Sequence, residues 1–212
     1  MCCQFYIDYN TMQDILRVVD DAAVDISSFG QRDIHPTDPS VIITGDRSGD
    51  FQLLRAQEMR WGFPGFDGKQ LLINARAESA VEKKSFRDSV LRRRCVIPAG
   101  HFYEWDRTKT KIIFTCEGSS SLYMAGFYNY FHSDQGANGK TGKRGGIDEF
   151  RFIILTTEAN ESMKPVHDRM PLILPENQIR DWIFDDGMVG EILEQSSPML
   201  SRYQEYEQLT LF

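Results

Sequence analysis

The sequence is poor in cysteine and histidine, and it contains no long apolar run. Its 212 residues include four cysteines, too few for a disulfide framework, so we expect a protein of the reducing cytoplasm. The four histidines are scattered and no Cys-x-x-Cys pair is present, so no metal or cofactor is expected. No segment is apolar enough to span a bilayer, and the first residues lack the features of a signal peptide. We therefore expect no membrane partner.

The sequence does contain enough apolar surface for one folded domain. Apolar residues make up 41%, with 14 Phe, 8 Tyr and 3 Trp, which excludes wholesale disorder. Short β-type segments predominate, and they predict the α+β class. We expect a single domain over residues 1–200, with a curled, mainly antiparallel, barrel-like β-sheet and peripheral helices, and a tail over 201–212. The main expected strands are 3–8, 41–44, 51–54, 71–73, 95–98, 102–105, 111–115, 123–127 and 150–157. We expect one helix capped by Asn10 or Thr11, one over 78–93 that is interrupted near Ser85, and two late helices over 175–184 and 188–195. Residues 132–148 are an expected mobile loop.

Charge is unevenly distributed along the chain. The formal net charge is −7, which taken alone argues against a nonspecific nucleic-acid binder. Residues 61–116, however, carry 11 basic and 6 acidic groups, between two acidic segments. Such asymmetry is typical of a polyanion-binding surface. The basic runs Lys83-Lys84 and Arg92-Arg93-Arg94 fit a solvated helix face equally well.

Cys2 is the first residue with distinctive chemistry. A small side chain at position 2 usually permits removal of Met1, which leaves a free α-amine and a thiol on adjacent carbons. The α-amine titrates near 7.7–8.0, well below lysine, so it is the better nucleophile near neutral pH. Amine and thiol together can condense with an aldehyde to a thiazolidine ring, whereas lysine stops at a Schiff base. The alternative interpretation, which holds for most proteins that begin Met-Cys, is that residue 2 is frayed and its thiol has no chemical role.

Three further segments place polar groups beside strand ends. Ile73-Asn74-Ala75-Arg76-Ala77-Glu78 supplies an amide, a guanidinium and a carboxylate. Phe102-Tyr103-Glu104-Trp105 holds one carboxylate among aromatics, where burial suits it to proton transfer. Val166-His167-Asp168-Arg169-Met170-Pro171 places an imidazole beside charge. Taken singly, His167 is a structural histidine, Glu104 the buried partner of an arginine, and Trp61-Gly62-Phe63-Pro64 plain core.

Together, Met1-Cys2, Trp61-Gly62 and these three segments resemble, in the same order, the SRAP family of SOS response-associated peptidases, the abasic-site processing proteins. The resemblance spans about residues 2–174. It implies a DNA-repair enzyme that binds single-stranded DNA, at the nucleoid or replication fork, and captures abasic sites covalently. The ring-opened abasic sugar presents an aldehyde, which Cys2 would trap as a thiazolidine.

The resemblance also implies roles for particular residues. Cys2 is the nucleophile through its amine and its sulfur. Asn74 should hydrogen-bond the sugar or the cysteine backbone. Glu104 should position the amine and move protons, and His167 should act as general acid and base on the sugar oxygen.

Four more residues are expected to contact DNA. Arg76 and Arg169 are candidate phosphate clamps, Trp61 is a candidate stacking or wedge residue, and Pro36 belongs to a Pro-Thr segment near the strand. One departure weakens the DNA contacts: the family usually begins Met-Cys-Gly-Arg, and here Cys3 and Gln4 replace the glycine and the arginine.

The last residues carry a separate signal. Gln208, Leu209, Leu211 and Phe212 lie in a pentapeptide that resembles the motif by which proteins bind the bacterial sliding clamp. A packed final strand or helix end is the alternative interpretation.

Two other functions remain open. A Cys, Glu and His set also fits an N-terminal-nucleophile hydrolase that acts on amides. Arginines and aromatics without the chemistry of Cys2 fit a non-covalent single-stranded DNA-binding module.

Overall fold

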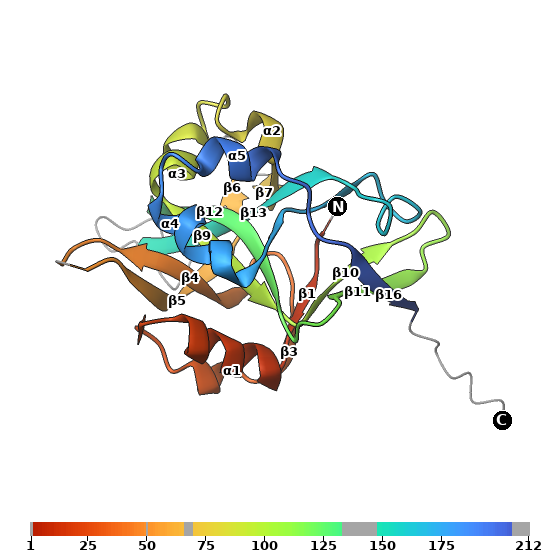
Figure 1. Ribbon diagram of the computed structural model, residues 1–212, viewed down its shortest axis with the longest axis horizontal. Coiled ribbons are helices and arrows are strands. Elements are labelled where there is room, and N and C mark those ends of the chain that lie inside the picture. The colour runs from red at the N-terminus through yellow and green to blue at the C-terminus, as the bar shows by residue number, and fades with distance from the viewer. Residues whose placement is uncertain (1, 50, 66–69, 133–147, 205–212) are drawn as a thin grey trace, which may run out of the picture.

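The computed structural model describes residues 2–49, 51–65, 70–132 and 148–204. At its centre a sheet closes on itself, which confirms the barrel-like α+β prediction (Figure 1). The β5–β13 pairing is parallel, and the other pairings around the barrel are antiparallel. The barrel strands, in order, are β4 (Pro39–Asp46), β5 (Leu53–Trp61), β13 (Asp148–Glu158), β12 (Leu122–His132) and β9 (Arg94–Ala99), which pairs back with β4.

Short strands extend this barrel, and a second sheet lies against it. Strand β8 (Asn74–Arg76) runs parallel to β13, with Asn74 opposite Ile154. The other additions are β2 (Asp21–Ala22) on β5, β14 (Arg169–Pro171) on β13 and β15 (Ile173–Leu174) on β12. The second sheet has the order β16 (Leu200–Gln204), β11 (Lys111–Cys116), β10 (His101–Trp105), β1 (Phe5–Ile7) and β3 (Arg32–Ile34), and β6 (Phe63–Pro64) pairs with β7 (Leu71–Leu72).

Alternate residues of the barrel strands pack into two hydrophobic cores, as the two-residue period of a strand requires. On β13, Phe152 and Ile154 belong to one core with the second sheet and α1 (Tyr9–Val18), whereas Ile153 and Leu155 belong to the other. Figure 1 shows the helices of the second core together on the side opposite α1. They are α2 (Ala77–Ala80), α3 (Arg87–Arg92), α4 (Ile179–Phe184) and α5 (Val189–Glu194). The 3₁₀ helices η1 (Ile26–Phe29) and η2 (Glu176–Gln178) complete the fold. Among the described residues, no helix is long and apolar enough to cross a membrane.

Several element boundaries differ from those expected. Helix α1 is capped by Asp8, whose Oδ1 accepts from Thr11 N at 2.7 Å, rather than by Asn10 or Thr11. The interruption expected near Ser85 within 78–93 is confirmed, because two short helices, Ala77–Ala80 and Arg87–Arg92, are separated there by a turn. Residues 201–204 belong to strand β16, paired with β11, so the sheet runs four residues into the expected tail. Residues 133–147 of the expected loop lie outside the described residues.

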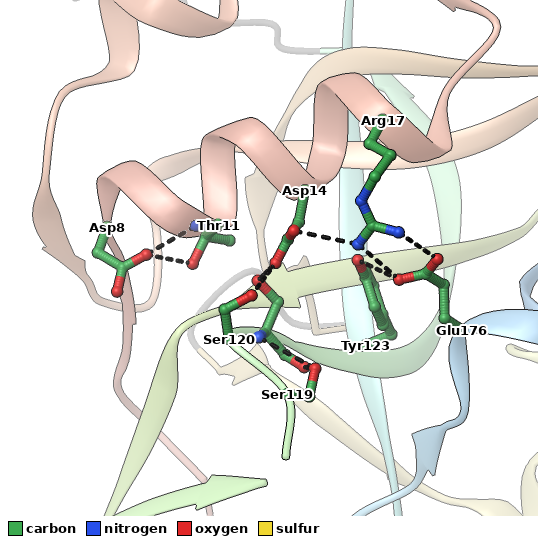
Figure 2. Close-up of polar contacts among 9 residues, drawn as sticks. Asp8, Thr11, Asp14, Arg17, Ser119, Ser120, Tyr123 and Glu176 are labelled. Atoms are coloured by element: carbon green, nitrogen blue, oxygen red, sulfur yellow. Dashed lines mark hydrogen bonds and ion pairs between the residues drawn. The ribbon is translucent and has the colours of Figure 1, made fainter. Parts of the chain in front are cut away.

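Polar side chains fasten α1 to two segments distant in sequence (Figure 2). Asp14 accepts from Ser120 Oγ at 2.5 Å, and Arg17 donates to both Asp14 (3.1 Å) and Glu176 (2.7 Å). The Tyr123 hydroxyl donates to the same Glu176 carboxylate at 3.3 Å. These bonds fix the helix against the segment before β12 and against η2.

Candidate active site

Cys2 lies just before β1, inside the first hydrophobic core. Only 1% of the residue is exposed, and its Sγ donates to the carbonyl of Gln4 at 3.8 Å. Strand β1 pairs with β10 on one side and β3 on the other. Cys2 is therefore part of the packed structure instead of fraying into solvent.

The surroundings of Cys2 favour its thiol over its thiolate. Burial is the largest cause that raises the pKa of Cys2, and the negative charge of Glu104 raises it further. The pKa of Cys3 is raised by the same two causes in the same order. At neutral pH the sulfur of Cys2 therefore carries its proton.

Asn74 holds the main chain of Cys2 in place. Its Nδ2 donates to the Cys2 carbonyl at 2.8 Å, although 72 residues separate the two in sequence. Asn74 is positioned by β8, which is hydrogen-bonded alongside β13. Its Oδ1 is buried and accepts no hydrogen bond from the described residues, so one acceptor remains available beside Cys2.

Glu104 comes from β10, the neighbour of β1. It is 4% exposed, and its charge raises the pKa of both Cys2 and Cys3. A buried carboxylate that acts electrostatically on two adjacent thiols lies close to the start of the chain. The structure thus brings Cys2, Asn74 and Glu104 together from three separate strand regions.

His167 lies on the turn between β13 and β14. Its Nδ1 accepts from the backbone N–H of Arg169 at 2.9 Å, so the neutral ring carries its proton on Nε2. The same Nδ1 is 3.0 Å from Asp168 Oδ1, a partner for the protonated ring. His167 and Trp105, the residue after Glu104, line one hollow of about 390 Å³. The imidazole segment therefore borders the end of β10.

Arg76 and Arg169 differ in the ion pairs that they form. Arg76 is exposed and forms no ion pair with the described residues. Arg169 forms a two-point ion pair with Glu78, at 2.8 and 2.9 Å, and also donates to the Thr156 carbonyl at 2.5 Å. The hydrogen bond from Arg169 lowers the pKa of Glu78. A phosphate at Arg169 would therefore compete with Glu78, a residue to which the sequence motif gave no role.

Trp61 is a core residue in this structure. It is fully buried, stacks on Phe152 with ring centroids 6.1 Å apart, and its Nε1 donates to the Ile73 carbonyl at 2.9 Å. A ring enclosed on all sides offers no face to a DNA base. This burial argues against the expected stacking or wedge role, and the indole instead supports the strand that leads into Asn74.

Pro36 lies in the turn between β3 and β4, which is hydrogen-bonded to the last residue of β5. The next residue, Thr37, has φ = 80°, a left-handed conformation that is costly for a β-branched side chain. Its N–H donates to the Trp61 carbonyl at 2.9 Å, which holds the turn in place. Pro36 itself is half-buried.

Gln4, which stands where the family usually has arginine, faces the protein interior. It is 7% exposed, and its carbonyl accepts from Tyr103 N and from the Cys2 sulfur. All four cysteines are free thiols. In the part of the chain that the structure describes, no group of His, Cys, Asp and Glu residues is arranged to hold a metal ion. The expected clamp motif, Gln208 to Phe212, lies outside the described residues.

Comparisons of the sequence with known proteins point to one family. A family model described as SOS response associated peptidase (SRAP) matches residues 1–210. The abasic site processing protein YoaM of Bacillus subtilis is 33% identical over 199 residues, covering 86% of this chain and 79% of that protein. The abasic site processing protein YedK of Escherichia coli is 26% identical over 191 residues, covering 85% and 79%. A crystal structure of a protein from Bacteroides thetaiotaomicron superposes with a TM-score of 0.76 at 20% identity, covering 97% of this chain and 93% of that one.

Proposed function

Because the chain belongs to the SRAP family, we propose that it processes abasic sites in single-stranded DNA by covalent capture at Cys2, after removal of Met1. Relatives in Bacillus subtilis and Escherichia coli are named abasic site processing proteins. The observation that carries the proposal is the fixed position of Cys2, whose carbonyl is bound by Asn74 and whose sulfur lies within the field of Glu104.

The chemistry begins at the nitrogen. The α-amine of Cys2 adds to the aldehyde carbon of the ring-opened sugar, and loss of one water gives an imine. The sulfur then bonds to the same carbon while the thiol proton passes to the imine nitrogen. The thiazolidine closes with water as the sole by-product, and no oxidant or metal ion takes part.

The raised pKa of Cys2 fits this order of events. A thiol that keeps its proton does not compete with the amine for the aldehyde, and it still has a proton to give when the ring closes. Glu104 takes a proton from the α-ammonium, which frees the nitrogen lone pair. Because Nδ1 of His167 accepts from Arg169 N–H, Nε2 is the ring nitrogen that would exchange a proton with the sugar oxygen as the sugar ring opens.

DNA binding in this proposal is local and electrostatic. Arg76 lies two residues beyond Asn74 and is exposed, so it is the phosphate contact nearest the lesion. Arg169 joins it by exchanging Glu78 for a phosphate. Pro36 and its turn border the strand. We expect affinity to fall with salt, with a logarithmic slope of about −0.7 per phosphate neutralised.

A denaturing gel tests the proposal. Protein lacking Met1 is incubated with single-stranded DNA that carries one abasic site, and we expect a slower band that survives denaturation. Cys2→Ala removes this band. Cys2→Ser leaves only an imine that needs borohydride to be trapped, because a hydroxyl does not close the stable ring.

The same experiment separates the alternatives. Turnover of an amide substrate without a DNA adduct would indicate an N-terminal-nucleophile hydrolase, which the protonated, buried sulfur of Cys2 disfavours. Binding to undamaged strands without an adduct would indicate a non-covalent module.

The C-terminal residues support a separate proposal, that Gln208, Leu209, Leu211 and Phe212 bind the bacterial sliding clamp. Deletion of residues 208–212 should abolish clamp binding and leave adduct formation intact. Loss of folding on deletion would show instead that the segment is part of the domain.

A further inference from the structure

Aromatic rings, some of them exposed and Tyr128 partly buried, gather on one face of the β12–β13 ribbon. Tyr130 and Phe150 lie directly opposite each other, with ring centroids 5.2 Å apart, and are 42% and 41% exposed. Tyr128 packs edge-on against Phe150 at 5.9 Å, and His132 against Tyr130 at 5.3 Å. We call these four side chains the aromatic ladder. Contiguous aromatic surface of this kind marks a binding site more often than chance exposure.

Arginines stand at the base of the ladder. Arg93 lies beside strand β12 at this point, because its Nε donates to the main-chain carbonyl of Tyr128 at 3.3 Å. The positive charges of Arg93 and Arg47 both reach the phenol of Tyr128, where they oppose the effect of burial on its pKa. Arg47 and Arg92, with Leu91 and Asp186, line a hollow of about 520 Å³.

These arginines outnumber the acids that pair with them. Asp88 is shared by Arg92, at 3.3 Å, and Arg93, at 2.5 Å. Asp186 is likewise shared by Arg94, at 2.5 Å, and Arg47, at 3.7 Å. Each carboxylate thus neutralises one of two guanidinium groups. The side chain of Arg92 is 78% exposed and that of Arg47 48%, so this surplus charge faces solvent.

The surface is separate from the candidate active site. The outer ends of β12 and β13, helix α3 and the tip of the β4–β5 hairpin lie on one side of the molecule, away from the N-terminus (Figure 1). Asn74 pairs with Ile154, four residues along β13 from Phe150. Arg92 and Arg93, which the mechanism leaves unused, are therefore part of this second surface, whereas Arg94 is buried.

We propose that the aromatic ladder and the arginine-lined hollow form a second binding site for single-stranded nucleic acid. Bases stack on Tyr130 and Phe150, whose faces accept any base, and a phosphate enters the hollow between Arg47 and Arg92. An apolar protein partner would not use the surplus positive charge. This second site rests on the proposed function, because it takes DNA as the ligand. It adds a contact between the protein and the undamaged part of the strand.

Binding of an undamaged single strand of about twenty nucleotides tests the site, since one such surface covers roughly four to sixteen. The double variant Tyr130→Ala/Phe150→Ala should weaken binding about tenfold or more, as expected from loss of base stacking. Tyr130→Phe keeps the ring and should bind as the wild type does. Arg92→Ala should weaken binding a few-fold and reduce the salt slope by about 0.7.

Matched controls lie on other faces of the protein. Tyr9→Ala removes an even more exposed ring, 61% exposed, from α1, and Arg202→Ala removes an exposed charge from β16; neither should change binding. Capture of a short abasic strand, of about six nucleotides, should be normal in the ladder variant. Unchanged affinity in Tyr130→Ala/Phe150→Ala, or an equal loss in Tyr9→Ala, overturns the second site. Failure of the wild type itself to form an adduct would instead overturn the proposed function.

Discussion

The surroundings of Cys2 and the aromatic ladder use burial in opposite ways. At Cys2 the packing removes water, raises the pKa of the thiol and fixes the main chain through Asn74. On the ladder, Tyr130 and Phe150 remain exposed and the arginines face solvent. A reacting group needs a defined position and protonation state, whereas a sequence-tolerant contact with a flexible strand needs accessible faces and charge. The predictions below test this contrast.

The largest effect is expected for Glu104→Gln. Loss of the buried carboxylate removes the proton acceptor for the α-amine, and capture of abasic DNA should slow roughly a hundredfold. At the same time the pKa of Cys2 should fall, because the charge of Glu104 is one of the causes that raise it. Alkylation of Cys2, followed by peptide mass mapping, should therefore reach its midpoint at lower pH.

These two changes run in opposite directions, which makes Glu104→Gln a sharp test. Glu117→Gln, at an exposed site after β11, serves as the control and should alter neither rate. If capture and alkylation both slow in Glu104→Gln, the substitution has disturbed packing, and the electrostatic role assigned to Glu104 is wrong.

A smaller effect is expected for Asn74→Ala. The Cys2 carbonyl loses its side-chain donor, so the first residues become less ordered, and we expect capture to slow about tenfold. Loss of one such hydrogen bond should lower the free energy of unfolding by about 1 kcal/mol. Single-turnover capture and urea unfolding measure the two effects. A normal capture rate in Asn74→Ala would show that the bond to Cys2 is only structural.

The smallest effect is expected for Glu78→Gln, which releases Arg169 from its two-point ion pair. Single-stranded DNA should bind about threefold tighter, since one competing negative charge is gone, and the salt slope should increase by about 0.7. Weaker binding would mean that Glu78 serves DNA by orienting Arg169.

The ion pair between Glu78 and Arg169 should also make the stability of the fold depend on pH. Arg169 lowers the pKa of Glu78 in the folded state, so the ion pair stabilises the fold above the usual carboxylate pKa and is lost as pH falls through the lowered value. The wild type should therefore have a higher Tm than Glu78→Gln at neutral pH, and the difference should shrink in acid.

Local sequence patterns predicted the positions of the strands and helices better than they predicted which strands pair. Alternation and turn residues located β4, β9 to β13 and the late helices, because these signals act over a few residues. Of β5 they located only the first two residues, since the strand expected over 51–54 is Leu53–Trp61 in the structure. The parallel closure of β5 on β13 was not predictable, since Arg60 and Arg151 are far apart in sequence. Strand β16 was assigned to a tail because its pairing with β11 has no local signature.

In the candidate active site, too, the residues were predictable and their long-range contacts were not. Motif resemblance selected Cys2, Asn74 and Glu104, and the structure brings them together. It did not reveal that Glu78 holds Arg169, because that ion pair spans 91 residues. The burial of Trp61 argues against its expected stacking role, and the motif alone does not show which way the indole points. The aromatic ladder did leave a signal, since Tyr128, Tyr130 and His132 alternate along a strand.

Peptide mass analysis of the adduct tests the central claim most directly. Protein without Met1 is mixed with an abasic single strand, without borohydride, and then digested and sequenced by mass spectrometry. We predict that the N-terminal peptide carries the sugar on Cys2, with a mass equal to the sum of the two reactants less one water and with no free thiol at that residue. An adduct on a lysine, or an N-terminal peptide with a free Cys2 thiol, would contradict the account.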